Sequence, residues 1–403
     1  MRMKYCLISV IVSIVLTSCS SDMALELLDS KDGTQKNEYR ISEQEAIAEG
    51  RRLLSMMDSY GDVNTRSSGY RRDFARVENV ISRSLTRSAQ NDTIAYIINY
   101  GENDGFVVIA QDRRAYPLYA ISDNGHLNLG DTIQNPGLSL FFNNMERDIS
   151  ARITVFPDTT KVEPFHPNDS IALAKKIIVR VKPMLPRKVA DWNQYFPFNR
   201  YCFTEDGSQA VVGCVALSTA QLMSYFKFPE EYNGHKYDWD DIVTNHDSNS
   251  LALLLSDLGR HENLDMDYGA GKSGALTSNV QRTLINFGYN NPDTLQVFEI
   301  KQVNAVLSNN PVLIRGSDSD LRFHHAWILD GYAEFYSSDY NFMRPNFLYH
   351  CVWGFGGQGN GFYYFRNGGI NTWDYESLDN DPNDILNEYE IRDDLKFYGI
   401  VTH

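Results

Sequence analysis

The sequence has few cysteines, a shortage of positive charge and no long apolar stretch. Its five cysteines include no pair with the close spacing of a zinc site, so no metal site is expected. Its 37 basic residues against 52 acidic ones give a net charge of −15. This balance argues against a nucleic-acid partner, because such a partner requires a concentrated basic surface. By contrast, 42% hydrophobic and 12% aromatic residues exclude wholesale disorder and suffice for packed cores in roughly two to three domains.

One stretch, at the N-terminus, could enter a membrane. Residues 1–18 read MRMKYCLISVIVSIVLTS, with an apolar run of about 11 residues that is too short to span a bilayer and typical of a secretory signal. The sequence Leu16-Thr17-Ser18-Cys19 then resembles the lipobox of bacterial lipoproteins, in which the cysteine becomes the lipidated first residue. We therefore expect an exported protein, either held on the outer membrane or cell surface by a lipid at Cys19 or secreted after processing. Plain cleavage near the same place is the alternative.

The cysteine count becomes informative once export is expected. Removal of Cys6 with the signal and acylation of Cys19 leave Cys202, Cys214 and Cys351. Three is an odd number, so at least one thiol stays unpaired within the chain in a compartment that allows disulfides. An unpaired thiol in an exported protein requires a reason.

A small α+β domain is expected over residues 41–150, after a polar tether at 19–40. It begins with a predicted helix at 42–57, where Ser42 and Glu45 have the spacing of a capping box. The further segments expected in this domain are an Arg/Ser-rich linker at 58–90 and short strands at 94–100, 105–110 and 116–121.

A second region is expected over residues 151–403, with helices first and strands afterwards. This order is typical of an α+β enzyme whose cleft lies between two halves. The acidic run at 374–394 is interpreted as solvated surface. Helices are predicted at 170–181, 215–228 and 249–258, and strands at 297–300, 311–316, 324–335, 346–355 and 361–365.

Cys214 is the strongest candidate for chemistry. It follows Gly213 directly and precedes an amphipathic helix, so the sequence predicts that its thiol lies at a helix N-terminus. Free N–H groups and the partial positive charge there stabilise a thiolate, which is the nucleophilic form. The alternative is an ordinary buried cysteine.

Two histidines, His324 and His325, begin the apolar run HHAWILDGY. A neutral imidazole beside a thiol can take its proton, and the imidazolium can later protonate a leaving amine. Because adjacent residues of a strand point to opposite faces, one of the two histidines at most can face Cys214. Either residue could instead be a surface or core histidine.

Two further segments could complete such a site. Gln194 lies upstream of the thiol in WNQYFPFN, where its amide could donate to an oxyanion together with the Cys214 backbone N–H. The run VWGFGGQGNG, which contains Trp353, indicates a strand entering a tight loop. Taken alone, the first segment could be an extended loop and the second a hydrophobic turn.

Over roughly residues 185–366, the chain resembles the streptopain family of papain-like cysteine peptidases. The resemblance lies in four segments, in this order: WNQYFPFN, GCVALSTAQLMSYFKFP, HHAWILDGY and VWGFGGQGNGFY. The resemblance implies an α+β fold with a papain-like, two-lobed catalytic domain, one lobe helical and the other an antiparallel sheet. It implies Cys214 as nucleophile, His325 as base and acid, Gln194 as oxyanion donor and Trp353 as the ring that shields the imidazole. His324 then lies outside the dyad, no cofactor is implied, and the substrates are proteins or peptides.

The N-terminal region is similar, more weakly, to the propeptide of that family. The similarity lies in AYIINY, GFVVIAQD and YPLYA, between residues 95 and 120. It implies that the domain at 41–150 inhibits the active site until it is cut off, at a point expected near 66–87 or 150–170. A plain accessory domain is the alternative.

One position departs from the family pattern. The family usually has Asn-Trp-Gly-Trp where this chain has Val352-Trp353-Gly354-Phe355, and the missing Asn orients the imidazole. Asp330 is a poor substitute, since in one strand it faces the other side of the sheet from His325. Either activity is reduced or another group, such as a backbone carbonyl, orients the ring.

Three hypotheses follow from this departure and from the remaining thiols. The chain could be a catalytically degenerate homologue that binds peptides, or an enzyme that transfers the acyl group to an amine. A disulfide between Cys202 and Cys351 would leave Cys214 as the one free thiol.

Overall fold

The computed structural model describes residues 39–58, 73–81, 93–155, 176–290, 292–295, 300–317, 324–336, 346–365 and 396–399. These residues belong to a single unit, Tyr39–His403. The expected signal at 1–18, Cys19, most of the tether and the acidic run at 374–394 lie outside the described residues. Within the described residues, no helix combines the length and the apolar character that crossing a membrane requires.

The N-terminal region contains the predicted helix. Helix α1 spans Glu43–Asp58, and its capping box is confirmed because Ser42 N donates to Glu45 Oε2 at 2.7 Å and Glu45 N donates to Ser42 Oγ at 3.2 Å. The three predicted strands are confirmed as β2, β3 and β4. The elements that follow α1 are β1 (Phe74–Ile81), β2 (Thr93–Tyr100), β3 (Phe106–Ala110), β4 (Leu118–Ser122), α2 (Leu129–Gln134) and α3 (Pro136–Val155).

Two parts of this region differ from the prediction. Strand β1 lies inside the expected linker at 58–90 and pairs antiparallel with β2. It is an edge strand whose first three residues are exposed, so its sequence lacks the apolar alternation of a half-buried strand. The helices α2 and α3, which close the region before residue 156, were not predicted.

The second region is confirmed as helical first and sheet-rich afterwards. Its helices are α4 (Arg187–Ala190), α5 (Cys214–Phe226), α6 (Trp239–Thr244), α7 (Asn249–Gly259), α8 (Asn279–Asn286) and α9 (Ile300–Leu307). Its strands are β5 (Lys176–Val181), β6 (Glu231–Tyr232), β7 (His235–Lys236), β8 (Asp293–Leu295), β9 (Val312–Ser317), β10 (His324–Tyr336), β11 (Asn346–Val352), β12 (Gly361–Tyr364) and β13 (Lys396–Gly399).

Two predicted elements of this region were wrong. Residues 176–181, expected in a helix, form β5, which pairs with β10. Their sequence KIIVRV is rich in β-branched residues, which favour a strand. The strand expected at 297–300 is replaced at its last residue by α9, which begins at Ile300, and its other residues lie outside the described part.

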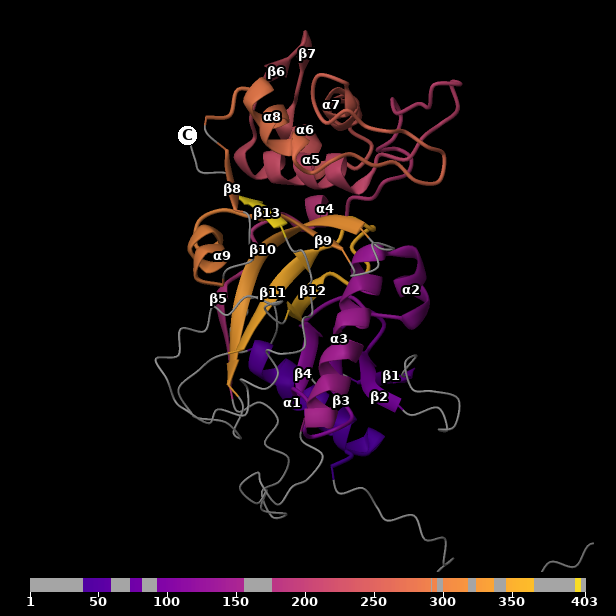
Figure 1. Ribbon diagram of the computed structural model, residues 1–403, viewed down its shortest axis with the longest axis vertical. Coiled ribbons are helices and arrows are strands. Elements are labelled where there is room, and N and C mark those ends of the chain that lie inside the picture. The colour runs from indigo at the N-terminus through magenta and orange to yellow at the C-terminus, as the bar shows by residue number, and fades with distance from the viewer. Residues whose placement is uncertain are drawn as a thin grey trace, which may run out of the picture. The chain divides into compact units, whose positions relative to one another are not determined.

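The N-terminal and C-terminal regions share one 11-stranded sheet. Its main path runs β1-β2-β3-β4-β12-β11-β10-β9-β13-β8, and the junction is the antiparallel pairing of β4 with β12. Ala120 lies opposite Tyr363 there, and Ile121 opposite Phe362. The N-terminal strands therefore extend the sheet that carries His325. In Figure 1, α5 to α8 gather beyond one end of this sheet, while α2 and α3 lie beside it.

Strand β10 separates two cores by the alternation of its side chains. Ala326 and Ile328 belong to the core that contains α5, whereas Trp327 and Leu329 belong to the core that contains α3. All four are at most 2% exposed. A fully buried apolar side chain contributes roughly 1.5–3 kcal/mol, so register errors in β10 are strongly disfavoured.

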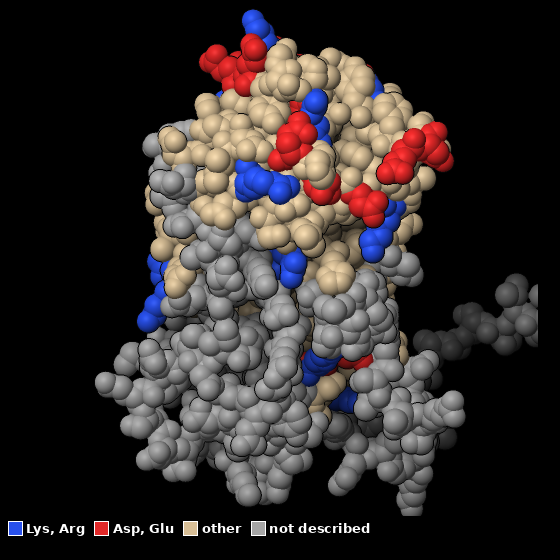
Figure 2. Space-filling model, turned by 45° about the horizontal axis from the view of Figure 1, so that its top comes forward, with Lys and Arg blue, Asp and Glu red and all other residues tan. Residues whose placement is uncertain are grey.

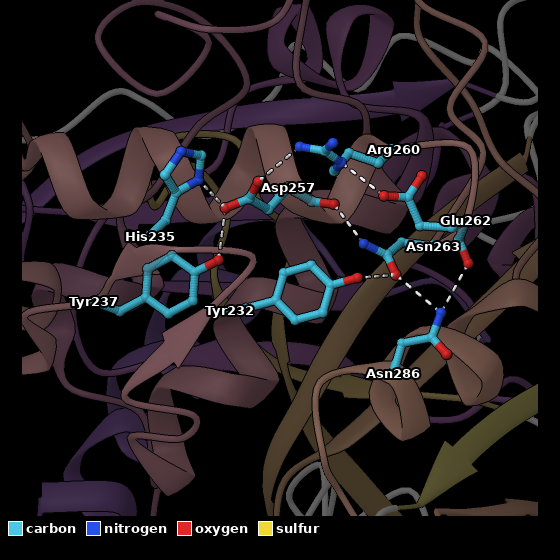
Figure 3. A network of polar contacts seen from close by, with 8 residues as sticks. All are labelled: Tyr232, His235, Tyr237, Asp257, Arg260, Glu262, Asn263 and Asn286. Carbon is cyan, nitrogen blue, oxygen red and sulfur yellow. Dashed lines mark hydrogen bonds and ion pairs between the residues drawn. The ribbon is translucent and has the colours of Figure 1, made fainter.

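A polar network stabilises the helical lobe away from this sheet (Figure 3). Buried Asp257 of α7 accepts hydrogen bonds from Tyr237 Oη and from His235 Nδ1, both at 2.7 Å, and its backbone carbonyl accepts from Asn263 Nδ2 at 2.7 Å. Burial and the Asp257 carboxylate raise the pKa of Tyr237. The network attaches the β6–β7 hairpin to α7 and has no contact with the predicted site residues.

Acidic and basic side chains are interspersed on the face of the helical lobe that Figure 2 shows, with uncharged surface between them. Two of the ion pairs on this lobe join Lys227 to Asp240, at 2.7 Å, and Arg200 to Asp247. Exposed pairs of this kind contribute about 0–1 kcal/mol each, so the cores rather than the surface charges stabilise the lobe.

Candidate active site

Cys214 is the first residue of α5, as the sequence predicts. Gly213 precedes it with φ 86°, a conformation that favours glycine, and a Cβ there would lie 2.4 Å from Met266 Cε and 3.0 Å from the Ser273 carbonyl oxygen. The Gly213 carbonyl then accepts the Leu217 N–H at 3.1 Å, which begins the helical ladder. The Gly-Cys sequence is thus required by the turn that places the thiol at the helix N-terminus.

The thiol of Cys214 lies against the sheet lobe. Burial raises its pKa above the ordinary value of 9.0, whereas hydrogen bonds from the backbone of Ala326 and of Val215 act in the opposite direction. Ala326 is the residue after His325 in β10. Cys214 is therefore a protonated, partly exposed residue, held beside the start of that strand.

His325 lies in an aromatic cage and is 2% exposed. Its ring stacks on Trp327, with centroids 6.0 Å apart, and is also flanked by Trp353 at 6.5 Å and Phe355 at 5.6 Å. The predicted neighbour Trp353 is thus one of three rings around the imidazole. Trp353 is itself anchored by its Nε1, which donates to the Gly359 carbonyl at 3.0 Å.

A backbone carbonyl orients His325. The imidazole Nε2 lies 2.8 Å from the Trp353 carbonyl oxygen. Because a carbonyl can only accept, Nε2 carries the hydrogen, and Nδ1 of the neutral ring keeps a lone pair that can take a proton. Burial lowers the pKa of His325 from 6.5 to about 4, against the smaller opposite effect of the Trp353 carbonyl.

Neither Val352 nor Asp330 contacts this ring. Val352, the last residue of β11, is fully buried in the core that contains α5 and Ala326, whereas the His325 ring lies against Trp327, in the other core. Asp330 instead approaches His350 Nδ1 at 2.5 Å and accepts from Leu185 N at 3.0 Å. The expectation that Asp330 is directed elsewhere is confirmed.

Gln194 is placed near Cys214 by its backbone. Its carbonyl oxygen accepts the Val212 N–H at 3.0 Å, two residues before the thiol. The segment that leads to Gln194 is attached to the Trp353 loop, since Gly356 N donates to the Trp192 carbonyl at 3.0 Å. The structure thus brings together the segments of all four predicted site residues.

The start of α3 covers the imidazole. A Cβ on Gly137 would lie 2.7 Å from His325 Cδ2 and 2.4 Å from Trp353 Cε3, so only glycine fits. Asn135 caps this helix, accepting from Gly137 N at 3.0 Å and Leu138 N at 3.2 Å, and is 1% exposed. Since a helix N-terminus carries partial positive charge, α3 disfavours a protonated His325.

Cys214 and His325 are not hydrogen-bonded to each other in the described structure. The Cys214 thiol is hydrogen-bonded by the Ala326 backbone, whereas the His325 imidazole donates to the Trp353 carbonyl. With the thiol pKa raised and the imidazole pKa lowered, both groups are neutral near pH 7. A thiolate–imidazolium pair would require proton transfer from Cys214 to His325, and the desolvation that shifts both pKa values opposes this transfer.

The three described cysteines are all free thiols. The hypothesis that Cys202 and Cys351 pair is wrong, because Cys202 lies in the core of the helical lobe and Cys351 in the core between the sheet and α3. Burial raises the pKa of Cys202 to about 11 and that of Cys351 well above its ordinary value, so both are poor nucleophiles.

Sequence reasoning missed four residues of this site. Trp327 and Phe355 complete the cage, Gly137 covers it, and Asn360 holds the Trp353 loop. Trp327 was accessible to prediction, since it lies two residues from His325 in one strand. The part of the chain that the structure describes contains no group of three or more His, Cys, Asp or Glu side chains suited to a metal ion.

Two known protein families match the regions of the chain that form this site. The Peptidase C10 family matches residues 192–363, and the Spi protease inhibitor family matches residues 39–149, well over half of the chain together. Residues 192–363, which hold the candidate site, are thus similar to the Peptidase C10 family, and residues 39–149 are similar to a protease inhibitor family. The first match contains Gln194, Cys214, His325 and Trp353, and the second contains Gly137 and most of α3.

Curated relatives of this chain are named as thiol proteases or streptopain. Streptopain of Streptococcus pyogenes is 26% identical over 319 residues, which cover 66% of this chain and 73% of streptopain. The thiol protease/hemagglutinin PrtT of Porphyromonas gingivalis is 24% identical over 317 residues, covering 69% of this chain. This chain spans 34% of the length of PrtT.

Solved structures similar to this chain come from Prevotella intermedia. Prointerpain A has a TM-score of 0.49 at 20% identity, covering 81% of this chain and 99% of that one. Active interpain A has a TM-score of 0.38 at 21% identity, covering 55% and 95%. The α+β architecture itself, a helical lobe against an antiparallel sheet, is confirmed by the elements described above.

Proposed function

We propose that this chain is an exported cysteine endopeptidase made as a zymogen. Its N-terminal domain at 41–150 acts as an intramolecular inhibitor of the catalytic domain at 151–403. The substrates are proteins or peptides, and a lipid at Cys19 attaches the chain to the outer membrane or cell surface unless processing releases it. The observation that carries this proposal is the contact of the Cys214 thiol, at a helix N-terminus, with the backbone next to His325.

The proposed reaction is acyl transfer to Cys214 and then to water. In the active enzyme, Nδ1 of His325 takes the thiol proton, and the thiolate attacks the peptide carbonyl. The Cys214 N–H and the Gln194 amide stabilise the oxyanion, while the imidazolium protonates the leaving amine. Water, deprotonated by His325, then attacks the thioester, releases the acid and restores the thiol.

The proposed inhibition acts on His325. Helix α3 keeps water from the ring through Gly137 and directs its positive end at it, and both effects disfavour the imidazolium on which turnover depends. Removal of the N-terminal domain lets water reach His325, so its pKa rises from about 4 toward 6.5. The thiolate–imidazolium pair then becomes accessible.

Loss of the N-terminal domain tests this function. The wild-type chain is expected to convert to a shorter form that hydrolyses a denatured protein substrate and reacts with a thiol-directed epoxide. Cys214→Ala removes the nucleophile, so this variant is expected to remain at full length with activity lower by about 10⁴-fold or more. Cys202→Ala, which removes a buried thiol, is the matched control and should process normally. If the wild-type chain neither processes nor reacts with the epoxide, the peptidase proposal fails.

The second candidate is a degenerate homologue that binds peptides without cleaving them. Val352, in place of the family Asn, is the observation that favours it. The same epoxide experiment separates the two, because a degenerate chain retains Cys214 but lacks the activated thiolate. Peptide binding by an epoxide-resistant wild-type chain would support this second candidate.

A further inference from the structure

The absence of an orienting side chain at Val352 leaves His325 dependent on the main chain of Trp353. The Trp353 carbonyl accepts from Nε2 at 2.8 Å, so the imidazole orientation depends on the peptide planes around Trp353. We propose that Asn360 is a positioning residue that fixes the Trp353 backbone, and through it His325, relative to the Gln194 segment. This inference rests on the proposed function, in which His325 is the catalytic base.

Asn360 uses both ends of its amide. Its Oδ1 accepts the Trp353 N–H at 3.0 Å, and its Nδ2 donates to the Ala190 carbonyl at 3.0 Å. The Trp353 N–H and C=O flank a single Cα, so restraint of the N–H fixes the position of the Cα from which the carbonyl that holds His325 extends. The first bond therefore controls the imidazole, and the second bond ties it to the end of α4.

The hydrogen bond from Asn360 to Ala190 connects it to the segment that contains the proposed oxyanion donor, Gln194. Ala190 is followed by Trp192, whose carbonyl accepts from Gly356 N at 3.0 Å, and by Gln194, whose carbonyl accepts from Val212 N at 3.0 Å. Val212 lies two residues before Cys214. A continuous path of hydrogen bonds and short backbone segments thus joins nucleophile, oxyanion donor and base, and Asn360 contributes a side chain to it.

The loop has other anchors that do not depend on Asn360. The Trp353 indole donates to the Gly359 carbonyl at 3.0 Å, and Gly357 packs directly on Asp191, where a Cβ would lie 2.3 Å from Oδ1. Loss of the Asn360 amide therefore leaves the loop folded while the Trp353 peptide plane gains freedom. A change in kcat without a change in folding is the expected signature.

Two substitutions separate the two bonds. Asn360→Ala removes both, and the activated enzyme is expected to lose roughly ten- to a hundred-fold in kcat, as misplacement of a catalytic group costs, with KM within about twofold. Asn360→Asp keeps the acceptor for the Trp353 N–H and loses the donor to Ala190. It should retain more activity, with the acid limb of its pH profile moved to higher pH, because a nearby carboxylate stabilises the imidazolium.

The kinetic test starts from the full-length chain and measures the processed enzyme. The concentration of active sites is titrated with a thiol-directed epoxide. Asn286→Ala, in the network of Figure 3, is the matched control and should equal wild type. Either of two results would overturn the positioning role without contradicting the peptidase proposal. The first is a kcat of Asn360→Ala within twofold of wild type. The second is an Asn360→Asp enzyme that has the activity of Asn360→Ala and an unchanged acid limb of its pH profile.

A second measurement does not require activity. In the full-length Cys214→Ala chain with ¹⁵N-labelled histidines, His325 should show the Nε2–H tautomer, its signal being identified through His325→Gln. Addition of Asn360→Ala should mix the tautomers, and an unchanged signal contradicts the proposal. If wild type neither hydrolyses protein nor reacts with the epoxide, the proposed function fails, and this tautomer readout still decides the role of Asn360.

Discussion

Cys214 and His325 lie in regions that prepare them in different ways. Cys214 is the first residue of α5, is partly exposed, and owes its position to Gly213 and the helical lobe, with its thiol against the backbone of Ala326. His325 is the second residue of β10, its ring is enclosed by Trp327, Trp353 and Phe355, and the start of α3 also covers it. The thiol side thus belongs to the catalytic region, whereas the imidazole side is shared with the N-terminal region.

Under the proposed inhibition, this difference indicates that the N-terminal region acts on His325 and not on Cys214. A cysteine at a helix N-terminus keeps its stabilising N–H groups whether or not α3 is present. The low pKa of His325, about 4, arises from burial to which Gly137 contributes. Under the proposed inhibition, control through the imidazole requires no change in the helical lobe, because release of α3 removes one wall of the enclosure around His325.

The largest effect within this comparison concerns the oxyanion donor on the thiol side. Gln194→Ala is expected to lower kcat by about 10²–10³, as removal of one oxyanion donor does elsewhere, without altering the release of α3. The measurement is the turnover of a fluorogenic peptide by the activated enzyme. Gln209→Ala, a glutamine that bonds the backbone of residues 199 and 202, is the control. Equal turnover in the Gln194→Ala and Gln209→Ala variants would show that Gln194 is not an oxyanion donor.

A substitution on the imidazole side should have the opposite sign. Gly137→Leu places a side chain where a Cβ already lies 2.4 Å from Trp353, and overpacking of this kind costs about 1–3 kcal/mol. We expect the full-length chain to react with a thiol-directed epoxide roughly ten- to a hundred-fold faster than wild type. Gly130→Leu in α2, where nothing lies within 4 Å of a Cβ, is the control. A rate unchanged by Gly137→Leu would show that α3 does not control the site.

A smaller effect is expected from pH. A histidine whose folded pKa, about 4, lies below the open-state value of 6.5 contributes stability that is fully present above 6.5 and is lost as pH falls toward 4. Acidification from pH 7.5 to 5 should therefore favour release of α3 by at most roughly 30-fold through this group. Limited proteolysis of the Cys214→Ala chain measures it, and His325→Gln in that background should reduce the pH dependence. An identical dependence in both chains would exclude His325 as its cause.

The parts of the site that local sequence determines could be predicted. Gly213 and the apolar periodicity of α5 are adjacent in the chain, so the position of Cys214 followed from a turn and a helix. The capping of α1 by Ser42 and Glu45 followed in the same way. His325 could be assigned only through the family resemblance, since its neighbours alone do not distinguish it from a core histidine.

The parts that depend on tertiary contacts could not be predicted. Residues 176–181 form a strand because β10 is available to pair with them, and β1 forms against β2 despite its charged sequence. Gly137 and His325 are far apart in sequence, so no local pattern could reveal their contact. The substitute for the family Asn at Val352 is a backbone carbonyl, which no side-chain motif records.

The reactivity of Cys214 as a function of pH tests most directly whether the N-terminal region keeps the dyad neutral. Peptide-resolved mass spectrometry can follow alkylation of Cys214 in freshly purified full-length chain and in the processed chain. We predict that the full-length chain reacts slowly at pH 6 and rises only at a pKa above the ordinary thiol value of 9.0, whereas the processed chain reacts rapidly already at pH 6. Coincident profiles for the two forms would contradict the account.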